Sequence, residues 1–103
     1  MATAVDVIIS DPWELSAHGR LTGTVLSGGR YGEALLVQLS EPVLLGRLRV
    51  QFIVARHRHR DAPDLGIAPV SFNCVGSETL DQDRKEGVPF LASIEVRPDQ
   101  PSP

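Results

Sequence analysis

Hydrophobic and polar residues alternate along most of the chain, and this period of two is typical of β-strands with one buried face. In the first alternating run, residues 4–10, Val5, Val7 and Ile9 share one face and Asp6 lies on the other. The same alternation recurs in residues 21–27, 33–40, 47–55, 67–75 and 89–97. The pattern therefore predicts six short strands.

The alternation also predicts which side chains form the core. In residues 47–55 the inward positions are Leu48, Val50, Phe52 and Val54. The outward positions of that run are Arg47, Arg49 and Gln51. The expected core residues of the other later strands are Leu21, Val25, Leu35, Val37, Leu39, Ala68, Val70, Phe72, Cys74, Phe90, Ala92, Ile94 and Val96.

Glycine and proline separate the predicted strands. Residues 28–32, Gly-Gly-Arg-Tyr-Gly, form a loop rich in residues that tolerate positive φ, and Gly46 marks a second hairpin. Residues 11–14, Asp-Pro-Trp-Glu, are typical of a helix start, so one helical turn is expected there. Residues 77–86 fit either a short solvated helix or a loop.

Short strands with frequent turns and little helix predict an all-β fold. We expect a small antiparallel β-barrel of the SH3-like or OB-like kind, with a compact two-layer sandwich as the alternative. The barrel is favoured because closure removes exposed strand edges. Residues 1–97 are expected to form this single domain, and residues 98–103 a disordered tail.

One strand suggests a way for two copies to associate. Pro69 lies within residues 67–75, and proline is confined to edge strands or to the start of a strand because it lacks a backbone N–H. An exposed strand edge is a template for pairing with another chain. A homodimer through this strand is therefore a further expectation.

Composition limits the compartment and the class of protein. The chain has 103 residues, 42% hydrophobic and 22% charged, which fits one globular domain. Its lone Cys74 excludes an internal disulfide, and no run approaches the roughly 18 apolar residues that cross a membrane. The first residues lack the basic start of a signal peptide. We therefore expect a soluble, cytoplasmic protein without membrane contact.

Charge is the most uneven feature of the chain. The net charge is −3, yet residues 42–60 contain no Asp or Glu and five of the ten Lys and Arg residues. These five are Arg47, Arg49, Arg56, Arg58 and Arg60. They predict a cationic rim on an otherwise acidic molecule. The alternative is a solvated strand end that pairs with Asp61 and Asp64.

The arginines at positions 56, 58 and 60 conflict with the predicted phase of the strand before them. Continued in the same register, they would follow Val50, Phe52 and Val54 into the core. Three arrangements avoid this: the strand ends near Ala55, a bulge changes its phase, or the arginines project beyond the core. Each of them leaves a basic loop or rim.

Two residues of the glycine-rich loop are candidates for the same partner site. Tyr31 and Arg30 place an aromatic ring and a cation at a loop tip, which suits contact with a partner. Tyr31 is equally compatible with covering its own sheet. Trp13 is expected to anchor the amino-terminal turn against the barrel, with a place at a binding surface as the alternative.

His57 and His59 have a spacing that can present two imidazoles to a metal from one strand face. A third ligand would have to come from His18, Cys74, Asp61 or Asp64, and the flanking arginines oppose a cation. We interpret the two histidines as exposed side chains and expect no metal and no cofactor. Cys74 is interpreted as a small core residue rather than a nucleophile.

The function that these features favour is a non-enzymatic binding module whose cationic rim contacts an acidic protein partner. A nucleic-acid-binding barrel is the alternative, disfavoured by the acidic net charge and the scarcity of aromatic residues for base stacking. A small metal-dependent enzyme that uses His57 and His59 is the second alternative.

Overall fold

The computed structural model describes residues 3–11, 19–27, 34–58, 65, 68–79 and 87–97, and these contain six strands. The strands are β1 (Thr3–Asp11), β2 (Arg20–Ser27), β3 (Leu35–Leu45), β4 (Leu48–His57), β5 (Val70–Ser77) and β6 (Val88–Val96). The six predicted strands are thus confirmed, with ends that differ by a few residues. The largest differences are the extension of β3 to Leu45 and the later start of β5 at Val70.

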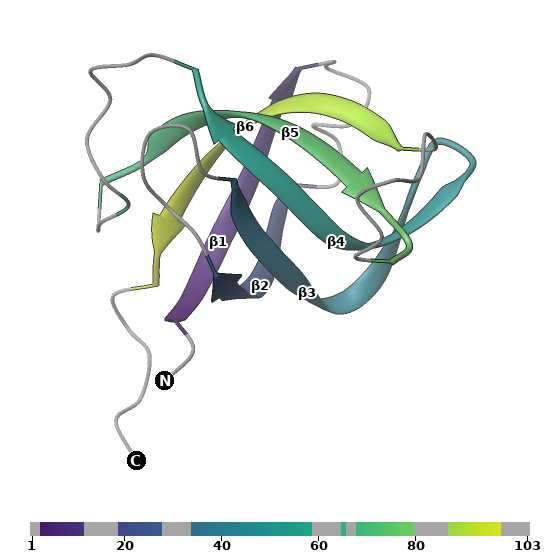
Figure 1. Ribbon diagram of the computed structural model, residues 1–103, viewed down its shortest axis with the longest axis horizontal. Coiled ribbons are helices and arrows are strands. Elements are labelled where there is room, and N and C mark those ends of the chain that lie inside the picture. Colours follow the sequence, from purple (N-terminus) through teal and green to yellow (C-terminus); the bar gives the residue numbers. More distant parts are fainter. Residues whose placement is uncertain are drawn as a thin grey trace.

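The strands close into an antiparallel barrel (Figure 1). Each strand pairs with the next along the chain, and β1 pairs with β6 to complete the ring. The Arg97 backbone N–H extends that closing ladder by donating to the Ala4 carbonyl at 3.0 Å. The barrel prediction is confirmed over the sandwich. The sequential strand order also differs from the Greek-key order of OB-fold barrels.

Pro69 indicates that residues 67–75 form either an edge strand or a strand that starts late; the edge strand is wrong, and the late start is confirmed because β5 begins at Val70. β5 pairs with β4 from His57↔Phe72 to Phe52↔Ser77, and with β6 from Val70↔Ile94 to Gly76↔Val88. Pro69 precedes the strand and therefore removes no hydrogen bond from either ladder. Both backbone edges of β5 are used within one molecule, so strand addition at β5 is no route to a homodimer.

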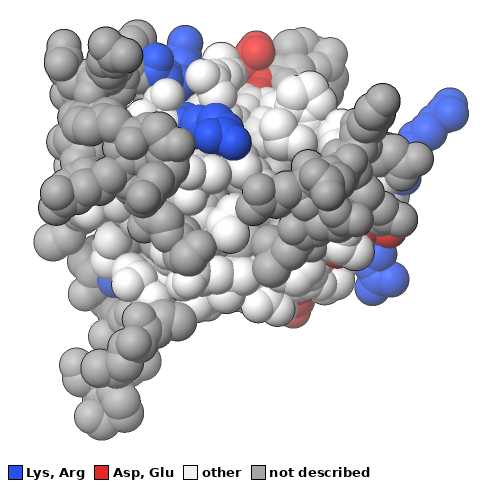
Figure 2. All heavy atoms as spheres, viewed as in Figure 1, with Lys and Arg blue, Asp and Glu red and all other residues white. Residues whose placement is uncertain are grey.

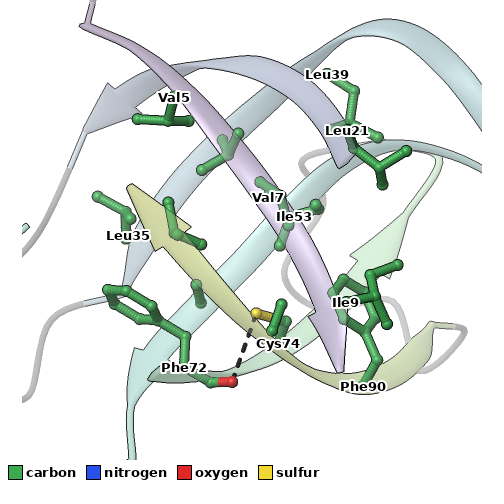
Figure 3. Close-up of a cluster of buried hydrophobic side chains, with 14 of the residues drawn as sticks. Val5, Val7, Ile9, Leu21, Leu35, Leu39, Ile53, Phe72, Cys74 and Phe90 are labelled. Carbon is green, nitrogen blue, oxygen red and sulfur yellow. Dashed lines mark hydrogen bonds between the residues drawn. The ribbon is translucent and has the colours of Figure 1, made fainter. Parts of the chain in front are cut away.

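The inner face of the barrel is the core, and most of its predicted residues are confirmed (Figure 3). The predicted residues that are buried are Val5, Val7, Ile9, Leu21, Leu35, Val37, Leu39, Val50, Val70, Phe72, Cys74, Phe90, Ala92 and Ile94. Val25, Leu48 and Val96 are partly buried against this cluster. Ala68 is exposed, contrary to prediction, because it lies before the first residue of β5.

The predicted phase of β4 is wrong beyond Val50. Ile53 and Ala55 are buried, and Phe52 and Val54 lie on the opposite face. The cause is a register shift in the β3–β4 ladder, where residues 39–42 of β3 face only Gln51 of β4. A bulge of this kind changes which side chains face the core.

The register shift resolves the conflict over the arginines. With Ala55 inside, Arg56 and Arg58 are exposed and His57 turns toward the core side, so neither of these two guanidinium groups enters the barrel. The second of the three arrangements, a bulge, is therefore the one observed. The strand continues past Ala55 to His57, and the Arg58 N–H still reaches the Ser71 carbonyl at 3.5 Å.

Other expectations fall partly or wholly on residues that are not described. The helical turn predicted at residues 11–14 is described only at Asp11, which ends β1. Residues 80–86 and the expected tail 98–103 lie outside the described residues. The described part of the chain contains no helix that is long and apolar enough to cross a membrane.

Candidate functional site

The basic residues predicted to form one rim lie at two ends of β4. Arg47 occupies the turn before β4 and Arg49 its second position, whereas Arg56 and Arg58 lie at its far end. A strand rises about 3.3 Å per residue, so Arg49 and Arg56 are separated by up to about 23 Å. All four residues are exposed, and Figure 2 shows basic atoms in separate groups on the face in view.

Several candidate residues cannot be placed relative to these arginines. Arg60, Arg30, Tyr31, His59 and Trp13 lie outside the described residues. Their predicted roles stay predictions.

The phase change in β4 builds a different surface on the outside of the barrel. Val54 and Arg56 face outward and lie across from Val75 and Asn73 of β5. On the other side of β5, Val75 lies across from Pro89 and Asn73 from Leu91. Since paired residues share a face, these side chains form two adjacent rows across β4, β5 and β6.

The second row continues onto β1. Leu91 is paired with Asp11, so the row runs Arg56, Asn73, Leu91, Asp11 over four strands. The first row, Val54, Val75 and Pro89, is apolar throughout. An apolar floor is thus bordered by a row with a cation at one end and an anion at the other.

These residues line a groove of about 550 Å³. The described residues that line it are Asp11, Val54, Arg56, Asn73, Cys74, Val75, Pro89, Phe90 and Leu91. Val75, on β5, is 44% exposed, so the apolar floor is open to solvent. Apolar floors with a few polar groups are typical of binding sites. We refer to this surface as the β4–β6 groove.

The charge of Arg56 is not balanced within the described residues. No ion pair in that part of the chain joins Arg56 to a carboxylate. Arg20 provides the contrast, because its Nη1 lies 2.8 Å from Asp6 Oδ2 and 2.9 Å from Glu95 Oε1. The pKa of the Arg20 guanidinium is raised, most by its hydrogen bond to Asp6 and next by its hydrogen bond to Glu95. Arg20 is thus paired with two carboxylates, whereas the Arg56 guanidinium is accessible to a ligand beside the groove.

Asp6, Arg20, Glu95 and Arg97 form a cluster of charged side chains, the Asp6 cluster, on the outer face of the barrel. It lies where β1 pairs with β2 on one side and with β6 on the other. Asp6 is only 5% exposed, and Arg97 Nε approaches its Oδ1 at 3.6 Å. The sequence placed Asp6 on the face opposite the core, and it is outward, but its burial was missed. The burial and ion pairing of Asp6 depend on Arg20 and Glu95, which are far from Asp6 in the sequence and share no local pattern with it.

Cys74 is confirmed as a core residue. It is 2% exposed, and its thiol donates to the Phe72 carbonyl with a Sγ–O distance of 3.8 Å (Figure 3). Burial raises the pKa of Cys74 to about 12. The thiolate is the reactive form of cysteine, so this side chain is held in its unreactive form at neutral pH.

The expectation that His57 is exposed is wrong, because its side chain is half-buried and packs against the core residue Phe72. Its ring centroid lies 4.8 Å from that of Phe72, with the planes tilted by 37°. The described residues contain no group of three or more His, Cys, Asp or Glu side chains that could hold a metal ion. His59, His18, Asp61 and Asp64 are outside the described ranges.

Sequence reasoning found Arg56 but missed the other residues of the groove. Val75, Pro89 and Leu91 appear in the sequence only as isolated apolar residues at outward positions, and single surface apolar residues are common. They can be recognised as one surface only from the cross-strand register, which places them side by side.

Comparison with known proteins gives no relative to guide the assignment. No family model, curated protein or solved structure matches the chain.

Proposed function

We propose that the protein is a non-enzymatic binding module that holds a segment of a partner protein in the β4–β6 groove. The observation that carries this proposal is the exposed apolar floor, centred on Val75, beside the accessible guanidinium of Arg56. Apolar side chains in a groove supply binding free energy when a partner removes them from water. The volume of about 550 Å³ lies within the range of about 300–1,000 Å³ that is usual for ligand sites.

The partner segment carries an apolar side chain and a nearby carboxylate. The apolar side chain covers Val54 and Val75, and the carboxylate pairs with Arg56. A guanidinium can donate two parallel hydrogen bonds to one carboxylate, which fixes its position as well as its charge. Arg58, exposed two residues further along, adds positive charge at the same end.

A protein partner explains these features better than a nucleic acid does. Nucleic-acid binding relies on a continuous basic surface and on exposed aromatic rings for stacking. The four described arginines of the predicted rim are divided between two ends of β4. The exposed large hydrophobic side chains of the described part are Leu26, Leu44 and Val75, none of which is aromatic.

A cytoplasmic location and self-association belong to the same proposal. The single cysteine forms no internal disulfide, in keeping with a reducing compartment. A homodimer would use a side-chain surface, because the backbone edges of β5 are already paired.

The test is to select displayed random peptides of about a dozen residues on the purified protein and to measure their affinity by fluorescence anisotropy. Peptides with an apolar residue next to Asp or Glu should be enriched. Val75→Asp should weaken their binding at least about tenfold, because it places a charge in the apolar floor. Leu44→Asp is the matched control, since Leu44 is 60% exposed on the β3–β4 hairpin, outside the groove.

Thermal unfolding of each variant checks that it folds. If Val75→Asp does not fold, Val75→Thr keeps the shape and adds only a hydroxyl, and it should still weaken binding. Failure to enrich any peptide, or equal affinity of wild type and the groove variants, would overturn the proposal.

A further inference from the structure

We infer that the β4–β6 groove selects a segment with charges of opposite sign at its two ends, an acid beside Arg56 and a base beside Asp11. The inference rests on the proposed function and deepens it by specifying the charge pattern of the partner segment. It follows from the arrangement of four residues in one row across the sheet.

The row places the two charges at opposite ends of the groove. Arg56, Asn73, Leu91 and Asp11 are successive cross-strand neighbours on β4, β5, β6 and β1. Neighbouring strands lie about 4.8 Å apart, so the three steps from Arg56 to Asp11 span roughly 14 Å. Two charges this far apart interact weakly with each other through water, and each can pair with its own group on a ligand.

Both charges are accessible and neither is balanced by a described neighbour. Arg56 and Asp11 are exposed. The ion pairs that join two described residues involve Arg20, Arg97, Asp6 and Glu95, all at the β1–β2–β6 seam. Among the described residues that line the groove, Arg56 and Asp11 are the charged ones. A ligand therefore meets one positive and one negative end.

The span also sets the spacing of the ligand charges. An extended chain rises about 3.3 Å per residue, so roughly 14 Å corresponds to about four residues. The residues between the two charges cover Val75 and Leu91, and they are expected to be apolar. Asn73, exposed in the middle of the row, offers a donor and an acceptor to the backbone of the segment.

A segment with two acids would place one of them beside Asp11, and a segment with two bases would place one beside Arg56. Like charges at close range reduce affinity, and this repulsion discriminates between partners as effectively as attraction does. The wild-type groove should prefer a mixed pair over either like pair by about tenfold, because in each like pair one attractive charge contact is replaced by a repulsive one.

The experiment repeats the selection of displayed random peptides on wild type, Asp11→Arg and Arg56→Asp. Wild type should enrich peptides with one acid and one base about four residues apart. Asp11→Arg should enrich peptides with acids at both positions, and Arg56→Asp peptides with bases at both. Anisotropy with one enriched peptide and its two like-charged versions should reproduce the tenfold preference and its change in each variant.

Matched controls separate the groove from net charge. Glu41→Arg makes the same charge change as Asp11→Arg at an exposed site on β3, outside the groove. Arg49→Asp does the same for Arg56→Asp at the other end of β4. Both controls should enrich the wild-type pattern. A variant that does not fold is replaced by Asp11→Asn or Arg56→Gln, which should lose the preference without inverting it.

The outcomes distinguish this inference from the proposed function. If peptides are enriched and Val75→Asp abolishes their binding, but their charge pattern is the same on wild type and both groove variants, the charge inference is overturned and the binding module stands. If no peptide is enriched on wild type, the proposed function is overturned and the inference fails with it.

Discussion

The Gln51 side chain donates a hydrogen bond from Nε2 to the Leu39 carbonyl oxygen at 2.7 Å. The contact lies where the β3–β4 register shifts, so the side-chain amide takes the place of a ladder partner. Beyond this point Ile53 and Ala55 are buried and Arg56 faces outward. The pair therefore stabilises the irregularity that gives the candidate groove its cation.

Replacing Gln51 by Met should lower the free energy of unfolding by about 1–3 kcal/mol. Met is similar in size but cannot donate, and it leaves the part-buried Leu39 carbonyl without this bond. Urea denaturation measures the change, with Gln38→Met, at an exposed position of β3, as the matched control. Equal stability of the two variants would show that the hydrogen bond does not stabilise the bulge.

The fold was largely predictable because its signal is local. Alternation alone identified the strands and assigned residues such as Val7, Val37 and Ile94 to the core, since successive side chains of a strand face opposite sides. It failed at Phe52 and Val54, because the bulge depends on how β3 pairs with β4. A shift of one residue moves every later side chain to the other face.

The candidate groove was much less predictable because its residues meet only through long-range pairing. Arg56 stands out in the sequence as part of a basic tract, whereas Asp11 belongs to a four-residue pattern that is typical of a helix start. These two residues belong to one row because β5 and β6 lie between them in the closed barrel. The basic tract itself was read as one surface, but Arg49 and Arg56 lie at opposite ends of β4.

Asp6→Asn should destabilise the barrel more than Glu95→Gln does. Asp6 is nearly buried and lies near both Arg20 and Arg97, whereas Glu95 makes one of these contacts, and a buried charge-assisted hydrogen bond contributes more than an exposed one. We expect a loss of about 1–3 kcal/mol for Asp6→Asn, measured by urea denaturation. A larger loss for Glu95→Gln would contradict the central role of Asp6 in this cluster.

Gly76→Ala should destabilise the core by about 1–3 kcal/mol through overpacking. A Cβ atom at this position would lie 2.8 Å from Val50 Cγ1, closer than real contacts allow. The double variant Gly76→Ala with Val50→Ala removes the clashing methyl groups and should be more stable than the sum of the two single losses implies. Strictly additive losses in urea denaturation would mean that the clash is relieved elsewhere.

Stability should fall above about pH 9 because of Cys74. Burial raises the pKa of this thiol from its ordinary value of 9.0 to about 12. Between these two values the unfolded chain releases the thiol proton and the folded barrel retains it, so rising pH favours unfolding. The stabilisation is complete below about pH 9 and is lost at up to about 1.4 kcal/mol per pH unit above it.

Cys74→Ala provides the comparison that isolates this effect, since all other titrating groups are common to both proteins. The variant is less stable at every pH because it loses a buried side chain. Its deficit should shrink by about 1.4 kcal/mol between about pH 8 and pH 10, as the wild type loses the contribution of the neutral thiol. Urea denaturation at the two pH values measures the deficit. A constant deficit would mean that Cys74 titrates alike in the folded and unfolded chains, which its burial does not allow.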